Sequence, residues 1–293
     1  MGVHGKILGV DEMEGKGSMN SFLEKEDYEE HCCPLNMNQA TERINTRRVI
    51  STLDGYLGRN DYEGAERHLK YWVAEAENGR DMHGKLTVTN ELIGLYRKVG
   101  QEKECVEAIE ESLRLVELLE LTDTISYGTT LVNAATGYKA FSKPEKAMPL
   151  YRKAQEVYEK MLGSDDGKLG ALYNNMALAL CELGEYKEAE SYYFKALEIM
   201  KLQEFGELEE AITYLNLIDL KVAEMGQEAS EAIIEEYITR AEELLKTESI
   251  PRNGYYAFVC EKCAPVFGYY GYFMLEMEFK NRAKEIYERN RTV

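Results

Sequence analysis

The residues best suited to metal or redox chemistry are two cysteines, Cys260 and Cys263, which form a CxxC pair. Such a pair supplies half of a tetrahedral zinc site. The run His31-Cys32-Cys33 would complete that site only if the N-terminal segment reached the last part of the chain. A thioredoxin-like role would need a strand–helix–strand context, which the surrounding sequence lacks. Because unpaired cysteine is often buried as a small apolar residue, we favour two packed thiols and keep a thiol or zinc site as the weaker alternative.

The stretch from Gly9 to Ser18 comes nearest to a phosphate-binding loop, but it departs from that motif. Five residues separate Gly9 from Gly15, one more than the motif has, and Gly17 stands between Lys16 and Ser18. The acidic side chains inside the stretch would also repel phosphate. Elsewhere, the four histidines are not spaced for nucleophilic catalysis or for metal binding. We therefore predict a protein that is not an enzyme and that needs neither a metal nor a cofactor.

The composition narrows the class of protein further. The 293 residues include 35 Lys and Arg against 53 Asp and Glu, which gives a formal net charge of −18. This acidity argues against nucleic-acid binding, because neutralising phosphates requires a basic face. No segment approaches the roughly 18 consecutive apolar residues of a membrane-spanning helix, and the first residues lack the apolar core of a signal peptide. We therefore expect a cytoplasmic protein with reduced cysteines, no nucleic-acid partner and no membrane partner.

The window from Leu172 to Leu197 has the pattern of two amphipathic helices joined by a short break. Ala189, Tyr193 and Ala196 lie on one face of the second helix, at positions i, i+4 and i+7. Gly184 stands in the break, where a left-handed residue commonly follows the end of a helix. This window therefore predicts a helical hairpin.

The same hairpin pattern recurs along the chain. Steps of 40 to 45 residues carry the three face positions onto five other units. In chain order these are Ala65, Leu69 and Trp72; Cys105, Ile109 and Ser112; Ala147, Tyr151 and Ala154; Ile234, Ile238 and Ala241; and Glu276, Lys280 and Ala283. A nearly constant period over six units is typical of a repeat architecture, in which neighbouring hairpins bury each other.

These residues resemble the tetratricopeptide repeat family, most closely from Leu172 to Leu197. The usual period of about 34 residues is lengthened here, which is similar to the kinesin light chain type of repeat. The family's proline after the second helix is missing, and about three extra residues fall near Glu228 to Glu231. The resemblance implies an all-α, right-handed superhelical solenoid of about six antiparallel helix hairpins over residues 39–293, preceded by a flexible N-terminal arm, residues 1–38. We expect helices at 40–57, 61–78, 83–99, 101–120, 123–141, 144–162, 168–183, 185–202, 207–225, 229–246, 254–270 and 273–290.

Three asparagines share one register of the expected first helices. Asn90 and Asn174 lie 84 residues apart, Asn216 follows after 42 more, and Asn133 and Asn175 stand beside the same register. In the family that the chain resembles, first helices line a concave groove. An asparagine amide can accept from and donate to the backbone of an extended peptide, so we predict a peptide-binding ladder. The alternative is that these amides cap or bridge neighbouring helices, since asparagine is a poor mid-helix residue.

Basic residues on the same helices suggest how a partner would be selected. Arg97, Lys98 and Lys139 would form a basic spot able to receive a carboxylate. The same logic adds further groove candidates, namely Arg47, Thr87, Thr129, Thr136, Glu182 and Thr213. The predicted function is a non-catalytic scaffold that binds a protein or an extended peptide in the groove. The alternative is a peptide-responsive cytoplasmic regulator that acts by protein contact alone.

The last unit is unusually apolar where the solenoid should be capped. Phe273, Met274, Leu275, Met277 and Phe279 open its final helix, and little sequence follows to cover them. This end either packs on itself or binds another surface, for which a homodimer through the C-terminal repeat is one candidate.

Overall fold

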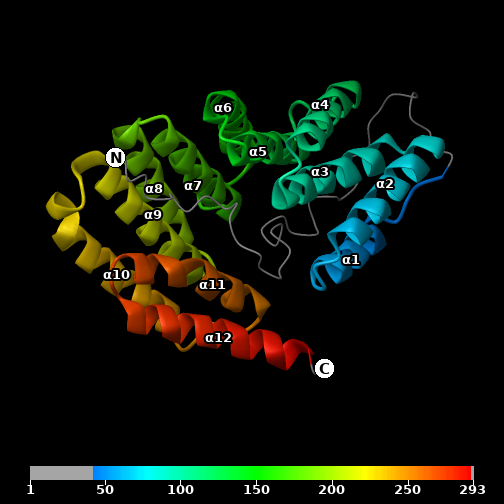
Figure 1. Ribbon diagram of the computed structural model, residues 1–293. Coiled ribbons are helices and arrows are strands. Elements are labelled where there is room, and N and C mark those ends of the chain that lie inside the picture. The colour runs from blue at the N-terminus through cyan, green and yellow to red at the C-terminus, as the bar shows by residue number, and fades with distance from the viewer. Residues whose placement is uncertain (1–41, 292–293) are drawn as a thin grey trace. The chain divides into compact units, whose positions relative to one another are not determined.

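The computed structural model describes residues 42–291, and within this range it contains twelve α-helices, one short 3₁₀ helix and no strand (Figure 1). The fold is the all-α repeat solenoid that the sequence predicts. The α-helices are α1 (Thr46–Leu57), α2 (Tyr62–Asn78), α3 (Met82–Val99), α4 (Glu102–Leu118), α5 (Ile125–Ala140), α6 (Pro144–Met161), α7 (Gly167–Glu182), α8 (Tyr186–Met200), α9 (Glu207–Met225), α10 (Glu231–Lys246), α11 (Gly254–Tyr269) and α12 (Phe273–Arg291).

The helices form two compact units, divided between Gly163 and Ser164. The N-terminal unit contains α1–α6 and the C-terminal unit contains α7–α12, so each unit has three helix hairpins. Within a unit, the first helix of each hairpin also contacts the first helix of the next one, as α3 contacts α5 and α9 contacts α11. We call the odd-numbered helices of a unit its first-helix layer. This is the layer that the family resemblance assigns to the groove.

A left-handed backbone residue turns the chain within every hairpin. Gly184, between α7 and α8, has a φ of +78°, as the sequence predicts. The equivalent residues of the other hairpins also have positive φ, and they follow each other at the period of the repeat; they are Asn60, Gly100, Ser142, Gly226 and Gly271. The short 3₁₀ helix, Glu228–Ser230, lies where the sequence has its three extra residues. The insertion is therefore absorbed in a turn, and the helices keep their register.

The central one of the three repeated face positions is buried in five of the six hairpins. At the position of Tyr193, the residues of these hairpins are at most 1% exposed; they are Leu69, Ile109, Tyr151, Tyr193 and Ile238. In α12 the same position is Lys280, whose side chain is 54% exposed and pairs with Glu276 at 2.6 Å. The outer side of α12 is therefore polar at the point where another hairpin would stack. The exposed lysine at this position makes α12 a poor surface for a further hairpin.

The apolar start of α12 is divided between the core and the surface. Phe279 is fully buried and stacks on Phe267 with ring centroids 5.4 Å apart, and Leu275 packs against the same core. Phe273, Met274 and Met277 remain exposed. The end of the solenoid thus packs partly on itself.

The first helix begins later than the sequence pattern suggests, at Thr46 instead of residue 40. Asn45 explains this start, because its side chain accepts a hydrogen bond from the backbone N–H of Arg48 at 3.0 Å and caps the helix. Asp81, the N-cap of α3, accepts from the backbone N–H of Ile44 at 3.0 Å and holds the segment before α1. The predicted arm, the Gly9–Ser18 stretch and the His31-Cys32-Cys33 run lie outside the described residues.

The helices do not have the dimensions and composition that a bilayer requires. Within residues 42–291, none combines the length and the apolar character needed to cross a membrane.

Candidate functional site

Asn90 lies in the first-helix layer of the N-terminal unit and bridges two of its helices. The side chain is 5% exposed, and its Nδ2 donates to Thr130 Oγ1 of α5 at 3.1 Å. Its Oδ1 is buried without a hydrogen-bond partner in the described part of the chain. The Nδ2 group of Asn90 therefore bridges two helices, which is the alternative that the sequence left open. The Oδ1 acceptor remains unused.

Asn174 and Asn216 lie on α7 and α9, which contact each other in the C-terminal unit. Asn216 is 1% exposed, and neither Oδ1 nor Nδ2 has a hydrogen-bond partner among residues 42–291. Asn174 is half-buried, and its Oδ1 is likewise buried and unpartnered within that range. Buried polar atoms without partners are rare, and each one calls for an explanation. These two amides hold hydrogen-bonding capacity that the fold itself does not use.

The other predicted residues near this register vary in exposure. Asn133 on α5 and Asn175 on α7 are half-buried. At the equivalent position of α11, after the three extra residues are counted, stands Glu261, whose carboxylate accepts from Tyr287 Oη at 3.1 Å. The amide register thus continues as a carboxylate in the last hairpin. Sequence reasoning missed this residue because the ladder was sought among asparagines, and the last hairpin has a glutamate at this position.

The predicted basic spot is only partly present. Arg97 and Lys98 are half-buried in the last turn of α3, where positive charge favours the helix C-terminus. The ammonium group of Lys98 also lies 5.7 Å from the centre of the Tyr62 ring. Lys139, however, is 2% exposed in α5. The expectation of a surface spot formed by all three is therefore wrong, because Lys139 belongs to the packed interior of the N-terminal unit.

All four predicted threonines are hydrogen-bonded within the fold. Thr87 and Thr213 donate to the backbone carbonyl four residues earlier, at 3.1 and 2.8 Å. Thr129 and Thr136 exchange hydrogen bonds with the hydroxyl groups of Tyr158 and Tyr151, each at 2.9 Å. Arg47 and Glu182 are exposed, on α1 and α7. The polar positions of the first-helix layer thus divide into bonded hydroxyls, which support the helices, and underused amides.

Two tyrosine–carboxylate contacts join α11 and the residue after it to α9. No sequence motif predicts these contacts. Tyr270 Oη donates to Asp219 Oδ1 at 2.8 Å, and the hydroxyl of Tyr255 donates to Glu209. Burial raises the pKa of Glu209 to about 7, although the positive charge of Lys262 acts in the opposite direction. These contacts fix the spacing between neighbouring first helices in the C-terminal unit.

The two cysteines of the CxxC pair are packing residues of α11. Cys260 and Cys263 are at most 1% exposed. Burial raises the pKa of Cys260 to about 11 and also raises the pKa of Cys263. Because the thiolate is the metal ligand and the nucleophile, both groups are poorly suited to that chemistry. Across residues 42–291, no group of three or more His, Cys, Asp or Glu side chains is placed to hold a metal ion.

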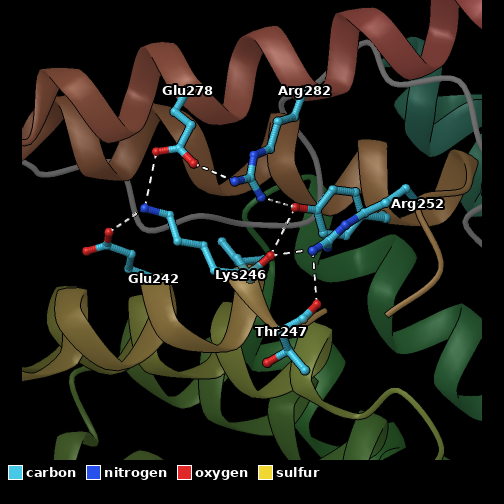
Figure 2. A network of polar contacts seen from close by, with 8 residues as sticks. Glu242, Lys246, Thr247, Arg252, Glu278 and Arg282 are labelled. Carbon is cyan, nitrogen blue, oxygen red and sulfur yellow. Dashed lines mark hydrogen bonds and ion pairs between the residues drawn. The ribbon is translucent and has the colours of Figure 1, made fainter. Parts of the chain in front are cut away.

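A polar network, the C-terminal clamp, joins α10, α11 and α12. Figure 2 shows Lys246 Nζ between Glu242 Oε1 at 2.7 Å and Glu278 Oε2 at 3.2 Å. Arg282 donates to Glu278 Oε1 at 2.6 Å and to Tyr256 Oη at 2.9 Å. The clamp therefore ties the last helix to both helices before it.

Arg252 completes the clamp at the end of α10. Its guanidinium group donates to the backbone carbonyls of Leu245 at 3.3 Å and Thr247 at 2.9 Å (Figure 2). It also lies 4.1 Å from the centre of the Tyr256 ring, while the Tyr256 hydroxyl donates to the Leu245 carbonyl at 2.9 Å. Cations that bind the last carbonyls of a helix stabilise its C-terminus. We assign the clamp to stability, because its cations and hydroxyl are engaged with the fold.

Comparison with known proteins places this geometry in a family. The tetratricopeptide repeat model matches residues 169–201, which cover most of α7 and α8. No curated protein matches the chain. The crystal structure of BtubC (BKLC) from P. vanneervenii is similar with a TM-score of 0.60 and 20% identity, over 71% of this chain and 84% of that one.

A second solved structure has the same kind of repeat. It is a variant of a Podosopora anserina protein with nearly identical, kinesin light chain TPR-like repeats, and it has a TM-score of 0.50 and 16% identity, over 71% of this chain and 97% of that one. At these identities the likeness concerns the fold. The chain therefore contains a tetratricopeptide repeat at residues 169–201, within a solenoid of helix hairpins whose fold is similar to that of tetratricopeptide repeat proteins.

Proposed function

We propose that this chain is a non-catalytic scaffold that binds an extended segment of a partner protein on its first-helix layer. Tetratricopeptide repeats are typically used for protein interaction, and the first helices carry half-buried amides, namely Asn133, Asn174 and Asn175, that could contact such a segment. The cysteine pair is protonated and packed, which leaves the thiol or zinc alternative without support in the described residues. The asparagine amides of the first helices can form hydrogen bonds with a peptide backbone.

The observation that carries the proposal is the unused hydrogen-bonding capacity of Asn174, which is half-buried; Asn216, which is 1% exposed, would add to it only once its side chain turns outward. Burying an amide without partners costs free energy, which a purely structural position would avoid. An extended peptide presents alternating N–H and C=O groups, and an asparagine amide can pair with both. Because α7 and α9 are neighbours in one unit, their amides are held at a fixed spacing along the same layer.

A peptide-selection experiment tests the proposal. A random peptide library displayed on phage would be selected against the full chain, and the affinity of enriched synthetic peptides measured by fluorescence anisotropy. The double variant Asn174→Ala/Asn216→Ala should bind about tenfold more weakly or worse, which corresponds to losing one or two hydrogen bonds. Asn281→Ala, at an exposed position of α12, is the matched control and should bind like the wild type.

Two outcomes would contradict the proposal. If the double variant binds the selected peptides as tightly as the wild type, the amides are not part of the binding surface. If no peptide is enriched on the wild-type chain, the first-helix layer does not capture extended segments. Circular dichroism of each variant separates a lost contact from a lost fold.

A further inference from the structure

Four large apolar side chains gather at the end of the α11–α12 hairpin. Tyr269 is 54% exposed, Phe273 68%, Met274 72% and Met277 52%. Phe273 and Met277 are one helical turn apart on the same side of α12, and Met274 lies beside them. Only three residues separate Tyr269 from Phe273, and the turn there is made by Gly271 with a φ of +88°. We call these four residues the apolar tip.

The apolar tip is not required by the core beneath it. Between and beside its members, Tyr270, Tyr272 and Leu275 pack against the core of the C-terminal unit. Phe279 is fully buried in the same core. The hairpin is therefore fixed by these four residues, and the tip adds only a contact between the Tyr269 and Tyr270 rings, whose centroids lie 4.9 Å apart. Exposed apolar groups gathered in this way are typical of a contact surface.

The tip is also a poor stacking site for another hairpin, although Phe273 lies two turns before Lys280 on the same face of α12. The stacking position of α12 is Lys280, in contrast to the buried apolar residues at this position in the other five hairpins. Farther along α12 the exposed side chains are polar or charged; they include Asn281, Lys284, Glu285 and Glu288. Apolar surface on this helix is thus confined to its first two turns.

We propose that the apolar tip is the contact surface of a symmetric dimer, in which the tip of one copy of this chain docks on the tip of a second copy. A large side chain that is half to three-quarters exposed offers about 100–150 Å², so the tip offers about 500 Å². A symmetric contact uses this patch twice and buries about 1,000 Å², the lower limit for a specific interface. A different partner would have to bring an apolar patch of its own.

Charge also favours this location for self-association. The tip contains no ionised side chain, and the carboxylate at its edge, Glu276, is paired with Lys280 at 2.6 Å. The whole chain carries a formal charge of −18, so two copies repel one another, and contact at a locally neutral patch minimises that repulsion. Added salt screens the remaining repulsion, and the dimer should therefore become tighter as ionic strength rises.

Sedimentation velocity of the full chain, from low to several hundred micromolar, tests the dimer. The wild type should shift from monomer to dimer, at lower concentration in high salt than in low salt. Met274→Lys/Met277→Lys should weaken dimerisation about tenfold or more, because each contact would bury unpaired charge. Leu202→Lys, at another residue that is 69% exposed, is the matched control and should dimerise like the wild type.

Cysteine variants test the symmetry of the contact. In a two-fold contact only residues near the axis meet their own counterparts, so at least one of Phe273→Cys, Met274→Cys and Met277→Cys should form a disulfide-linked dimer under mild oxidation faster than Leu202→Cys does. The native cysteines in the described range are all buried and are shared by all four variants. Equal rates in all four variants would overturn the two-fold contact.

Three further results would overturn the proposal. The wild type could remain monomeric over the whole concentration range. The dimer could survive the double lysine substitution, which would place its interface elsewhere. A monomeric wild type that captures another protein, with capture lost in the double lysine variant, would assign the tip to that partner. The test does not depend on peptide binding, because the residues involved lie on α12.

Discussion

At the scale of single residues, Asn216 is a position where stability and the proposed binding would favour different side chains. Both atoms of its amide are buried without a partner in the described structure. We predict that Asn216→Leu, which keeps a similar volume, stabilises the chain by about 1–3 kcal/mol, because it removes an uncompensated polar group. Urea denaturation followed by circular dichroism measures this gain. The same variant should lose affinity for peptides selected on the wild type.

Asn90 supplies the control for that substitution. Its Nδ2 is bonded to Thr130, so Asn90→Leu removes a hydrogen bond together with the unused acceptor and should give no comparable gain. If Asn216→Leu instead loses about 1 kcal/mol of stability, the usual net contribution of a hydrogen bond, the Asn216 amide is hydrogen-bonded in the native protein. Both the proposed function and this prediction would then have to be abandoned for Asn216.

Glu209 predicts how the stability of the C-terminal unit responds to pH. Its pKa is raised from 4.5 to about 7 by burial, so the folded state holds its proton where the unfolded state has released it. The resulting stabilisation is present below pH 4.5 and is lost as pH rises through about 7. We predict that Glu209→Gln removes about 1–3 kcal/mol of this pH dependence and makes the protein more stable than the wild type at pH above 7.

Thermal unfolding at several pH values from about 4 to about 8.5, a range that brackets this titration, provides the measurement. Glu228→Gln changes an exposed carboxylate outside the core and should leave the wild-type pH profile intact. If the Glu209→Gln profile has the same slope as that of the wild type, burial of Glu209 does not control the pH dependence. The glutamine side chain still accepts from Tyr255, so the contact with α11 is kept.

At the scale of elements, two glycines with equal space around them should respond to alanine in opposite ways. An added Cβ meets nothing within 4 Å at either Gly94 or Gly184. Gly94 lies inside α3, where alanine is the better helix former, whereas Gly184 has a φ of +78°. We predict that Gly94→Ala raises stability by about 1 kcal/mol and that Gly184→Ala lowers it by about 1–2 kcal/mol.

Calorimetric melting of the two variants beside the wild type measures both effects, and each serves as the other's control. A Gly184→Ala variant as stable as the wild type would mean that the turn can adopt another conformation. The left-handed turn would then not set the geometry of the hairpins.

Periodicity explains why the elements could be predicted from the sequence. Residues such as Ala189 and Tyr193 recur at a constant spacing and are buried for the same reason in each hairpin, so the helices and breaks follow from one pattern. The pattern predicts too early a start for α1 because it carries no information on the cap at Asn45. The asparagine register was predictable in the same way as the core, since it shares the period.

Contacts between elements were much less predictable. Lys139 has the sequence features of a surface residue, yet it is buried, because its exposure depends on neighbouring helices and not on its own helix. The bonds of Tyr255 to Glu209 and of Tyr270 to Asp219 join residues 46 and 51 positions apart. Such pairs share no periodic spacing, so only the folded structure identifies them.

At the scale of the whole molecule, the two units each provide a first-helix layer, and the apolar tip lies on a different element from the predicted binding residues. The two proposals therefore concern separate surfaces of the chain. Peptide capture would use α7 and α9, and self-association would use the end of the α11–α12 hairpin. Loss of one should leave the other intact, which makes the two proposals independently testable.

The polar cap at Lys280 bears on how a protein of this kind can grow in evolution. A duplicated copy of the α11–α12 hairpin placed after α12 would meet a charged side chain where the other hairpins present a buried apolar one. A duplicated internal hairpin would meet matching surfaces on both sides. Repeat number should therefore change more readily by insertion or deletion between existing hairpins than by addition after α12.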